Sequence, residues 1–73
     1  MEKSQLETEI KNEVISLVER AKRIGLSEPK LAKKIGVSLN AIWRWKTGVH
    51  IPSALHLKKM QQVIETEEAV FGD

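Results

Sequence analysis

The segment from Glu28 to Thr47 constrains the fold more than any other part of this chain. Its apolar residues are spaced for two short helices joined by a tight turn at Gly36, a residue type that adopts positive φ without steric cost. Such a pair would bury one set of side chains: Leu31, Ala32, Ile35, Val37, Ile42 and Trp45. Its second helix would turn another set outward: Leu39, Asn40, Trp43, Arg44 and Thr47. The segment therefore predicts a compact helical pair with one buried and one exposed face.

Apolar spacing also predicts a helix on either side of this segment. Residues 1–24 carry one apolar stripe at intervals of three and four residues, and Gly25 is placed to end that helix. The stripe consists of Leu6, Ile10, Val14, Leu17, Val18, Ala21 and Ile24. A last helix is predicted over residues 53–64, followed by an acidic tail over 65–73. No strand pattern occurs, so the sequence predicts an all-α fold, a compact bundle of four to five helices in a single domain spanning residues 1–73.

A chain of 73 residues is long enough for one small domain. At this length folding buries only ~60% of the surface of the unfolded chain, which favours a docking surface over a deep catalytic cleft. The lack of cysteine excludes disulfides and cysteine-ligated zinc, and it fits a reducing compartment. The first residues are too acidic and polar for a secretory signal, and no apolar run is long enough to cross a membrane. We therefore expect a cytoplasmic protein with no membrane partner.

The net charge of +2 conceals a strong division along the chain. Residues 1–19 hold two basic and five acidic side chains, and residues 47–73 hold two basic and four acidic ones. Residues 20–46 hold eight basic side chains against a single acid, Glu28. Lysines can solvate a helix surface without any partner, but positive charge gathered on one segment is expected where a protein meets a phosphate backbone.

Catalytic and metal-binding patterns are not found in this sequence. His50 and His56 have neither a cysteine nor a cluster of carboxylates beside them, so no metal site is expected. No nucleophile stands at a plausible spacing from a base, and no glycine-rich phosphate loop occurs. We expect neither an enzyme nor a cofactor.

The run GLSEPKLAKKIGVSLNAIWRW, continued by KTGVHIP, resembles the Cro/repressor type (XRE-like) of helix-turn-helix DNA-binding transcriptional regulators. Eleven positions in register carry the resemblance, which covers roughly residues 14–64: Gly25, Leu26, Ser27, Leu31, Ala32, Gly36, Val37, Ile42, Trp45, Gly48 and Pro52. The Arg-Trp-Lys triplet followed by Ile-Pro also resembles small phage transcription activators built on the same motif. The resemblance implies a lambda-repressor-like DNA-binding domain in which residues 28–47 form the helix-turn-helix. It further implies binding to double-stranded operator DNA, usually as a homodimer, and hence a place at the bacterial nucleoid.

The resemblance also assigns roles to residues of the second helix, 39–47, and of its surroundings. It implies base contacts in the major groove from Ser38, Leu39, Asn40, Trp43 and Arg44. It implies phosphate contacts from Ser27, Lys46, Thr47 and His50. Three positions depart from the family's pattern. Glu28 stands where glutamine is common and would repel a phosphate, Trp43 stands where a small residue is usual, and Lys46 stands where glutamate is common.

The chemistry of these side chains suits base recognition. The planar guanidinium of Arg44 matches the O6 and N7 acceptors of guanine, a contact worth ~1–3 kcal/mol of discrimination, although a phosphate contact or a solvated side chain is an alternative. Asn40 can offer a donor and an acceptor to adenine, and Leu39 can touch a thymine methyl. Ser38 either caps the second helix or contacts a base.

The two tryptophans require opposite interpretations. Trp45 follows Ile42 by three residues and is expected in the core. Trp43, two residues earlier, projects roughly 200° around the helix and is expected to be exposed. An exposed tryptophan on a basic helix indicates a partner, DNA first and a protein surface second.

Other classes of function are compatible with the same pattern. A protein-interaction adaptor or antirepressor would keep the fold without binding DNA, and a fragment of a recombinase or transposase is a third interpretation. For a homodimer, the candidate interfaces are the first helix through Leu6 and Ile10, and the tail around Val70 and Phe71.

Overall fold

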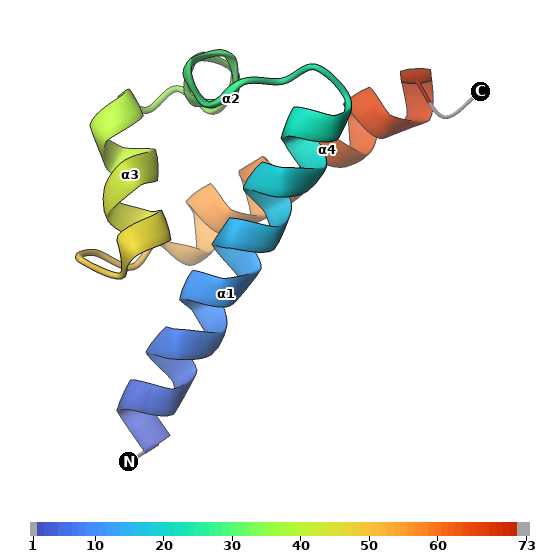
Figure 1. The fold of residues 1–73 in the computed structure, drawn as a ribbon. Helices are drawn as coiled ribbons and strands as arrows, with labels where there is room; N and C mark the ends of the chain where they lie inside the picture. Colours follow the sequence, from blue (N-terminus) through green and yellow to red (C-terminus); the bar gives the residue numbers. More distant parts are fainter. Residues whose placement is uncertain (1, 72–73) are drawn as a thin grey trace.

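Four α-helices and no strand make up the part of the chain described by this computed structural model, residues 2–71, with side chains described for residues 5–70. The helices are α1 (Glu2–Arg23), α2 (Glu28–Ile35), α3 (Leu39–Thr47) and α4 (Ala54–Phe71). The long helices α1 and α4 cross, and the short pair α2 and α3 lies to one side of them (Figure 1). The molecule measures 42 × 22 × 19 Å, and the first turns of α1 extend along the longest dimension (Figure 1). The predicted all-helical class is confirmed.

Three glycines end or separate the helices because each adopts the left-handed conformation. Gly25 follows α1 with φ +85°, Gly36 follows α2 with φ +88°, and Gly48 follows α3 with φ +81°. At Gly36 the chain turns within two residues, since the N–H groups of Gly36 and Val37 both donate to the carbonyl of Ala32, at 2.8 and 3.0 Å. This pattern stabilises a helix C-terminus and sets the angle between α2 and α3.

The core lies where the four helices meet, and it contains only hydrophobic residues. Of the six side chains predicted to face inward from residues 28–47, five are buried, and Val37 is half-buried against the core. The first helix contributes four residues of its predicted stripe, and the last helix contributes two. The buried set is Val14, Leu17, Val18, Ala21, Leu26, Leu31, Ala32, Ile35, Ile42, Trp45, Met60 and Ile64.

The last helix is longer than the sequence pattern indicates. α4 continues to Phe71, through most of the segment expected to be an acidic tail. Two ion pairs hold this extension. Arg20 Nε and Nη2 donate to the carboxylate of Glu68 at 3.0 and 2.6 Å, and Lys34 Nζ lies 3.6 Å from Glu67 Oε1. The acidic residues therefore dock the end of α4 on α1 and α2.

Two residues of the apolar stripe predicted for the first helix lie outside the core. Leu6 is 58% exposed and Ile10 is half-buried, because the first turns of α1 extend past the core. Leu55, in the first turn of α4, is exposed. His56 is half-buried, with its ring centroid 5.5 Å from that of Trp45. Of the two candidate dimer contacts in the tail, Val70 is exposed, and the side chain of Phe71 lies outside the described part.

Candidate functional site

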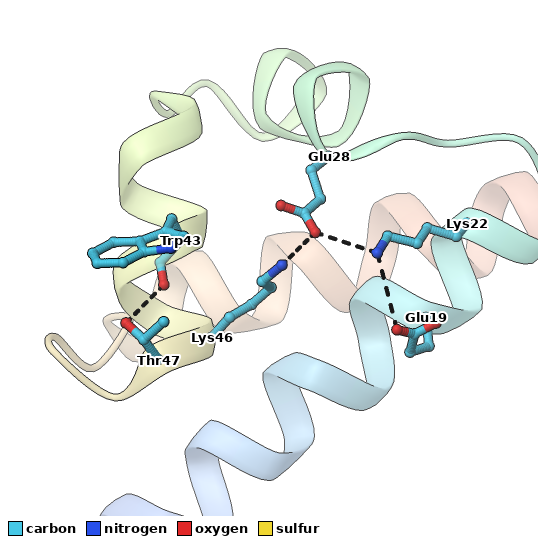
Figure 2. Close-up of polar contacts among 6 residues, drawn as sticks. All are labelled: Glu19, Lys22, Glu28, Trp43, Lys46 and Thr47. Atoms are coloured by element: carbon cyan, nitrogen blue, oxygen red, sulfur yellow. Dashed lines mark hydrogen bonds and ion pairs between the residues drawn. The ribbon is translucent and has the colours of Figure 1, made fainter.

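The exposed face of α3 carries four polar or aromatic side chains in helical register. Asn40, Trp43, Arg44 and Thr47 are spaced by three, one and three residues, so they share one side of the helix, and all four are exposed. Trp43 is 53% exposed, whereas Trp45 is 6% exposed, as predicted for both. Leu39 borders the same face and is also exposed. In Figure 2, Trp43 and Thr47 project from one side of α3 and Lys46 from another.

Two hydroxyl groups of α3 are used by the helix itself. Ser38 Oγ accepts a hydrogen bond from the N–H of Ala41 at 3.1 Å, so Ser38 is the N-cap of α3. Its hydroxyl proton can still be donated outward. Thr47 Oγ1 donates to the carbonyls of Trp43 at 2.9 Å and of Arg44 at 3.3 Å. The Thr47 hydroxyl therefore meets an external group as an acceptor unless it rotates.

A cluster of three charged side chains joins α1, α2 and α3 beside this face. The carboxylate Oε2 of Glu28, at the start of α2, accepts from Lys46 Nζ of α3 at 2.5 Å (Figure 2). Lys22 Nζ of α1 lies 3.4 Å from the same oxygen and 3.9 Å from Glu19 Oε1. The hydrogen bond from Lys46, assisted by the charges of Lys46 and Lys22, holds the pKa of Glu28 below its ordinary value, against the opposing effect of burial. Glu28 therefore fixes Lys46, an expected phosphate contact, in place.

The other residues expected to contact phosphate lie around the two ends of the helical pair. Ser27 is the N-cap residue of α2, is exposed, and makes no capping bond with its side chain. His50 follows α3, its side chain is exposed, and its N–H donates to the carbonyl of Arg44 at 3.2 Å. Thr47 and His50 border a shallow cavity of about 290 Å³, whereas Ser27 is not among its lining residues. The expected phosphate contacts are thus divided between two places.

The opposite wall of this cavity comes from α1, through Glu7, Thr8 and Lys11. Sequence patterns did not single out these residues, since they belong to an acidic segment that precedes the resemblance. Lys22 was counted only as one of several basic residues. Neither Lys11 nor Lys22 carries a local signal, because their neighbours, Gly48 and Glu28, lie outside α1.

Comparisons with models of protein families, with characterised proteins and with solved structures found no significant match. Within the described residues, no group of three or more histidine, cysteine, aspartate or glutamate side chains is placed to hold a metal ion. None of the helices in the described part of the chain is long and apolar enough to span a membrane. The exposed face of α3, the cluster around Glu28 and the cavity beside His50 are the features from which function is inferred.

Proposed function

We propose that the protein is a small transcriptional regulator that binds double-stranded DNA in a sequence-specific manner. In this proposal α2 and α3 form a helix-turn-helix, and α3 enters the major groove, with two copies on a two-fold operator. One observation carries the proposal. Side chains able to read bases occupy the exposed face of a short helix whose opposite face is anchored in the core by Ile42 and Trp45. Eight of the twelve basic residues lie in the segment that contains this helix, which agrees with a phosphate-rich partner.

The roles follow from the chemistry of each exposed group. Arg44 would bind guanine O6 and N7 in a bidentate contact, and Asn40 would bind adenine N6 and N7. Trp43 and Leu39 would pack on thymine methyl groups or on sugars, which removes apolar surface from water. Ser38 can donate its hydroxyl proton to a base acceptor while it caps the helix.

Phosphate contacts supply affinity and register but little sequence preference. Ser27, at the start of α2, and His50, in the loop after α3, offer exposed donors. Thr47 lies at the end of α3, and its hydroxyl, which donates to the carbonyls of Trp43 and Arg44, would have to rotate to donate to a phosphate oxygen. Lys46 contributes less than a free lysine would, because Glu28 neutralises much of its charge.

Selection of bound sites from random duplexes is the most direct test, because it yields the half-site, its spacing and its symmetry together. Arg44→Ala is then expected to weaken binding to the selected site by ~1–3 kcal/mol and to random DNA by much less. Fluorescence anisotropy on both duplexes measures this difference. Equal losses on the two duplexes would make Arg44 a phosphate contact.

A protein-interaction adaptor is the second candidate, and a specific surface favours it. Leu39, Trp43, Val49 and Ile51 are exposed apolar side chains on α3 and on the loop after it. Four such residues along α3 and the loop after it suit a protein partner as well as a groove. A titration with duplex DNA at two salt concentrations separates the candidates. The adaptor predicts no binding at low salt, whereas the DNA-binding proposal predicts tight binding that weakens steeply with added salt.

A further inference from the structure

We propose that Lys11, on the third turn of α1, binds a backbone phosphate of the DNA on which α3 docks. This inference rests on the proposed function and adds to it a contact from a part of α1 outside the resemblance. It identifies the cavity between α1 and the loop after α3 as the place where the duplex backbone meets the protein.

The side chain of Lys11 lies against Gly48, the glycine that follows α3. An ideal Cβ atom built on Gly48 would lie 3.0 Å from Cδ of Lys11. No side chain occupies that point, so the methylene stem of Lys11 lies across the turn that ends α3. Lys11 is half-buried, and it forms no ion pair with any side chain described here. Its stem is packed, and its ammonium group is left for an external anion.

The cavity beside this turn brings Lys11 and His50 to one place. Both line the same space of about 290 Å³, at the C-terminal end of the helix proposed to enter the groove. An ammonium and an imidazole are donors suited to phosphate oxygens. A duplex whose major groove holds α3 places its flanking phosphates beside the end of that helix. Lys11 can therefore bind a phosphate on the groove edge while α3 reads the bases.

Glu7 lies in the same cavity and determines which source of phosphate fits. Its carboxylate offsets the charge of Lys11, so a free phosphate ion gains little net attraction there. A DNA phosphate is held in place by the contacts of α3, so Lys11 meets it at high effective concentration. The geometry points to the duplex backbone rather than to a free anion, and it predicts opposite effects for the two charged side chains.

The test compares Lys11→Gln, Glu7→Gln and the control Lys58→Gln, which alters an exposed lysine of α4. Affinity is measured by anisotropy on the selected site and on random DNA, from 50 to 200 mM salt. Lys11→Gln should lower the affinity for both duplexes by the same factor. It should also reduce the slope of log K against log salt by about 1. The ratio of wild-type affinity to variant affinity should therefore fall roughly three- to fourfold between the lowest and the highest salt concentration. Glu7→Gln should raise the affinity for both duplexes, and Lys58→Gln should leave both affinities unchanged. Lys11→Arg should keep the wild-type dependence of affinity on salt.

The outcomes separate the failure of this inference from the failure of the proposed function. If the wild type binds the selected site and Lys11→Gln keeps the wild-type slope, Lys11 is no phosphate contact, and the proposed function stands. If the wild type binds no duplex at low salt, the proposed function is wrong and this inference with it. Replacing chloride by inorganic phosphate at constant ionic strength is the last arm. If inorganic phosphate lowers the affinity of the wild type for DNA more than chloride does, and Lys11→Gln abolishes this difference, the site belongs to the free ion. That result would overturn the inference.

Discussion

Replacing Glu28 by glutamine is expected to lower stability and to raise affinity for DNA. The side chain of Glu28 is 18% exposed and that of Lys46 is 27% exposed, so their hydrogen bond is partly shielded from water. Glutamine has nearly the same shape but no charge, and it leaves both Lys46 and Lys22 without a carboxylate at this position. The variant therefore removes the negative charge that ties the start of α2 to α3 and to α1, and leaves an amide oxygen that accepts only a weaker hydrogen bond from Lys46.

The loss of stability can be estimated from the burial of the cluster. A hydrogen bond between charged groups contributes ~1.5–3 kcal/mol when it is well shielded, and an exposed ion pair contributes ~0.2–1 kcal/mol. The Glu28–Lys46 bond lies between these limits, and Lys22 adds little because its side chain is 47% exposed. We expect Glu28→Gln to lower the free energy of unfolding at pH 7 by about 1–1.5 kcal/mol. For a domain of this size, that corresponds to a fall in Tm of roughly 4–12 °C.

The same cluster predicts how stability depends on pH. The pKa of Glu28 is lower in the folded protein than its ordinary value of 4.5, chiefly because Lys46 donates to the carboxylate. The unfolded chain therefore binds more protons in this range, and stability falls as the pH falls. The contribution of Glu28 is complete above pH 4.5 and disappears as the pH drops through the lowered pKa. The pKa of Glu68 is lowered by its hydrogen bonds from Arg20, so part of the acid dependence remains in Glu28→Gln.

Urea denaturation followed by circular dichroism measures the stability, and anisotropy measures the affinity. Glu19→Gln is the matched control: it removes a carboxylate that is 57% exposed and 3.9 Å from Lys22, and it should change stability by less than about 0.5 kcal/mol. DNA affinity should rise in Glu28→Gln because one negative charge is lost and Lys46 can turn to a phosphate. The reasoning is refuted if stability is unchanged, or if stability and DNA affinity fall together in a variant that remains folded.

Four further substitutions test the core, the exposed face of α3 and the turns that follow α1 and α3. Ile42→Ala should lower the free energy of unfolding by ~2–5 kcal/mol, measured by urea denaturation, because Ile42 is fully buried. A loss below about 1 kcal/mol would contradict its place in the core. Trp43→Ser should leave stability within ~0.5 kcal/mol of the wild type while it weakens binding to the selected site, and a large loss of stability would show that Trp43 supports the fold. Gly48→Ala and Gly25→Ala each force alanine into positive φ, at a cost of roughly 1–2 kcal/mol. In thermal denaturation Gly48→Ala should lower Tm more than Gly25→Ala does. A Cβ at Gly25 would meet nothing within 4 Å, whereas one at Gly48 crowds a neighbouring side chain. The reverse order would contradict this account.

The helical pair at the centre of the chain was predictable because its signals are local. The bounds of the observed helices Glu28–Ile35 and Leu39–Thr47 follow from cap and turn residues in the same segment. Gly36 ends the first helix, Ser38 begins the second, and Gly48 ends it. The separation of Trp43 from Trp45 was equally predictable, since two residues along a helix change the direction of a side chain by about 200°.

The contacts beside the candidate interface required the tertiary structure. Glu28 looked like a residue that only repels phosphate, yet it binds Lys46, which lies 18 residues away. α4 continues past residue 64 because Glu68 meets Arg20, 48 residues earlier in the chain. These partners follow from how the helices pack, and no periodicity within one helix encodes them. The sequence alone therefore determined which helices form and which faces they bury, because backbone conformation and amphipathic spacing are local properties. Only the packing of the four helices decided which charges are paired and which, like that of Lys11, form no ion pair with another described side chain.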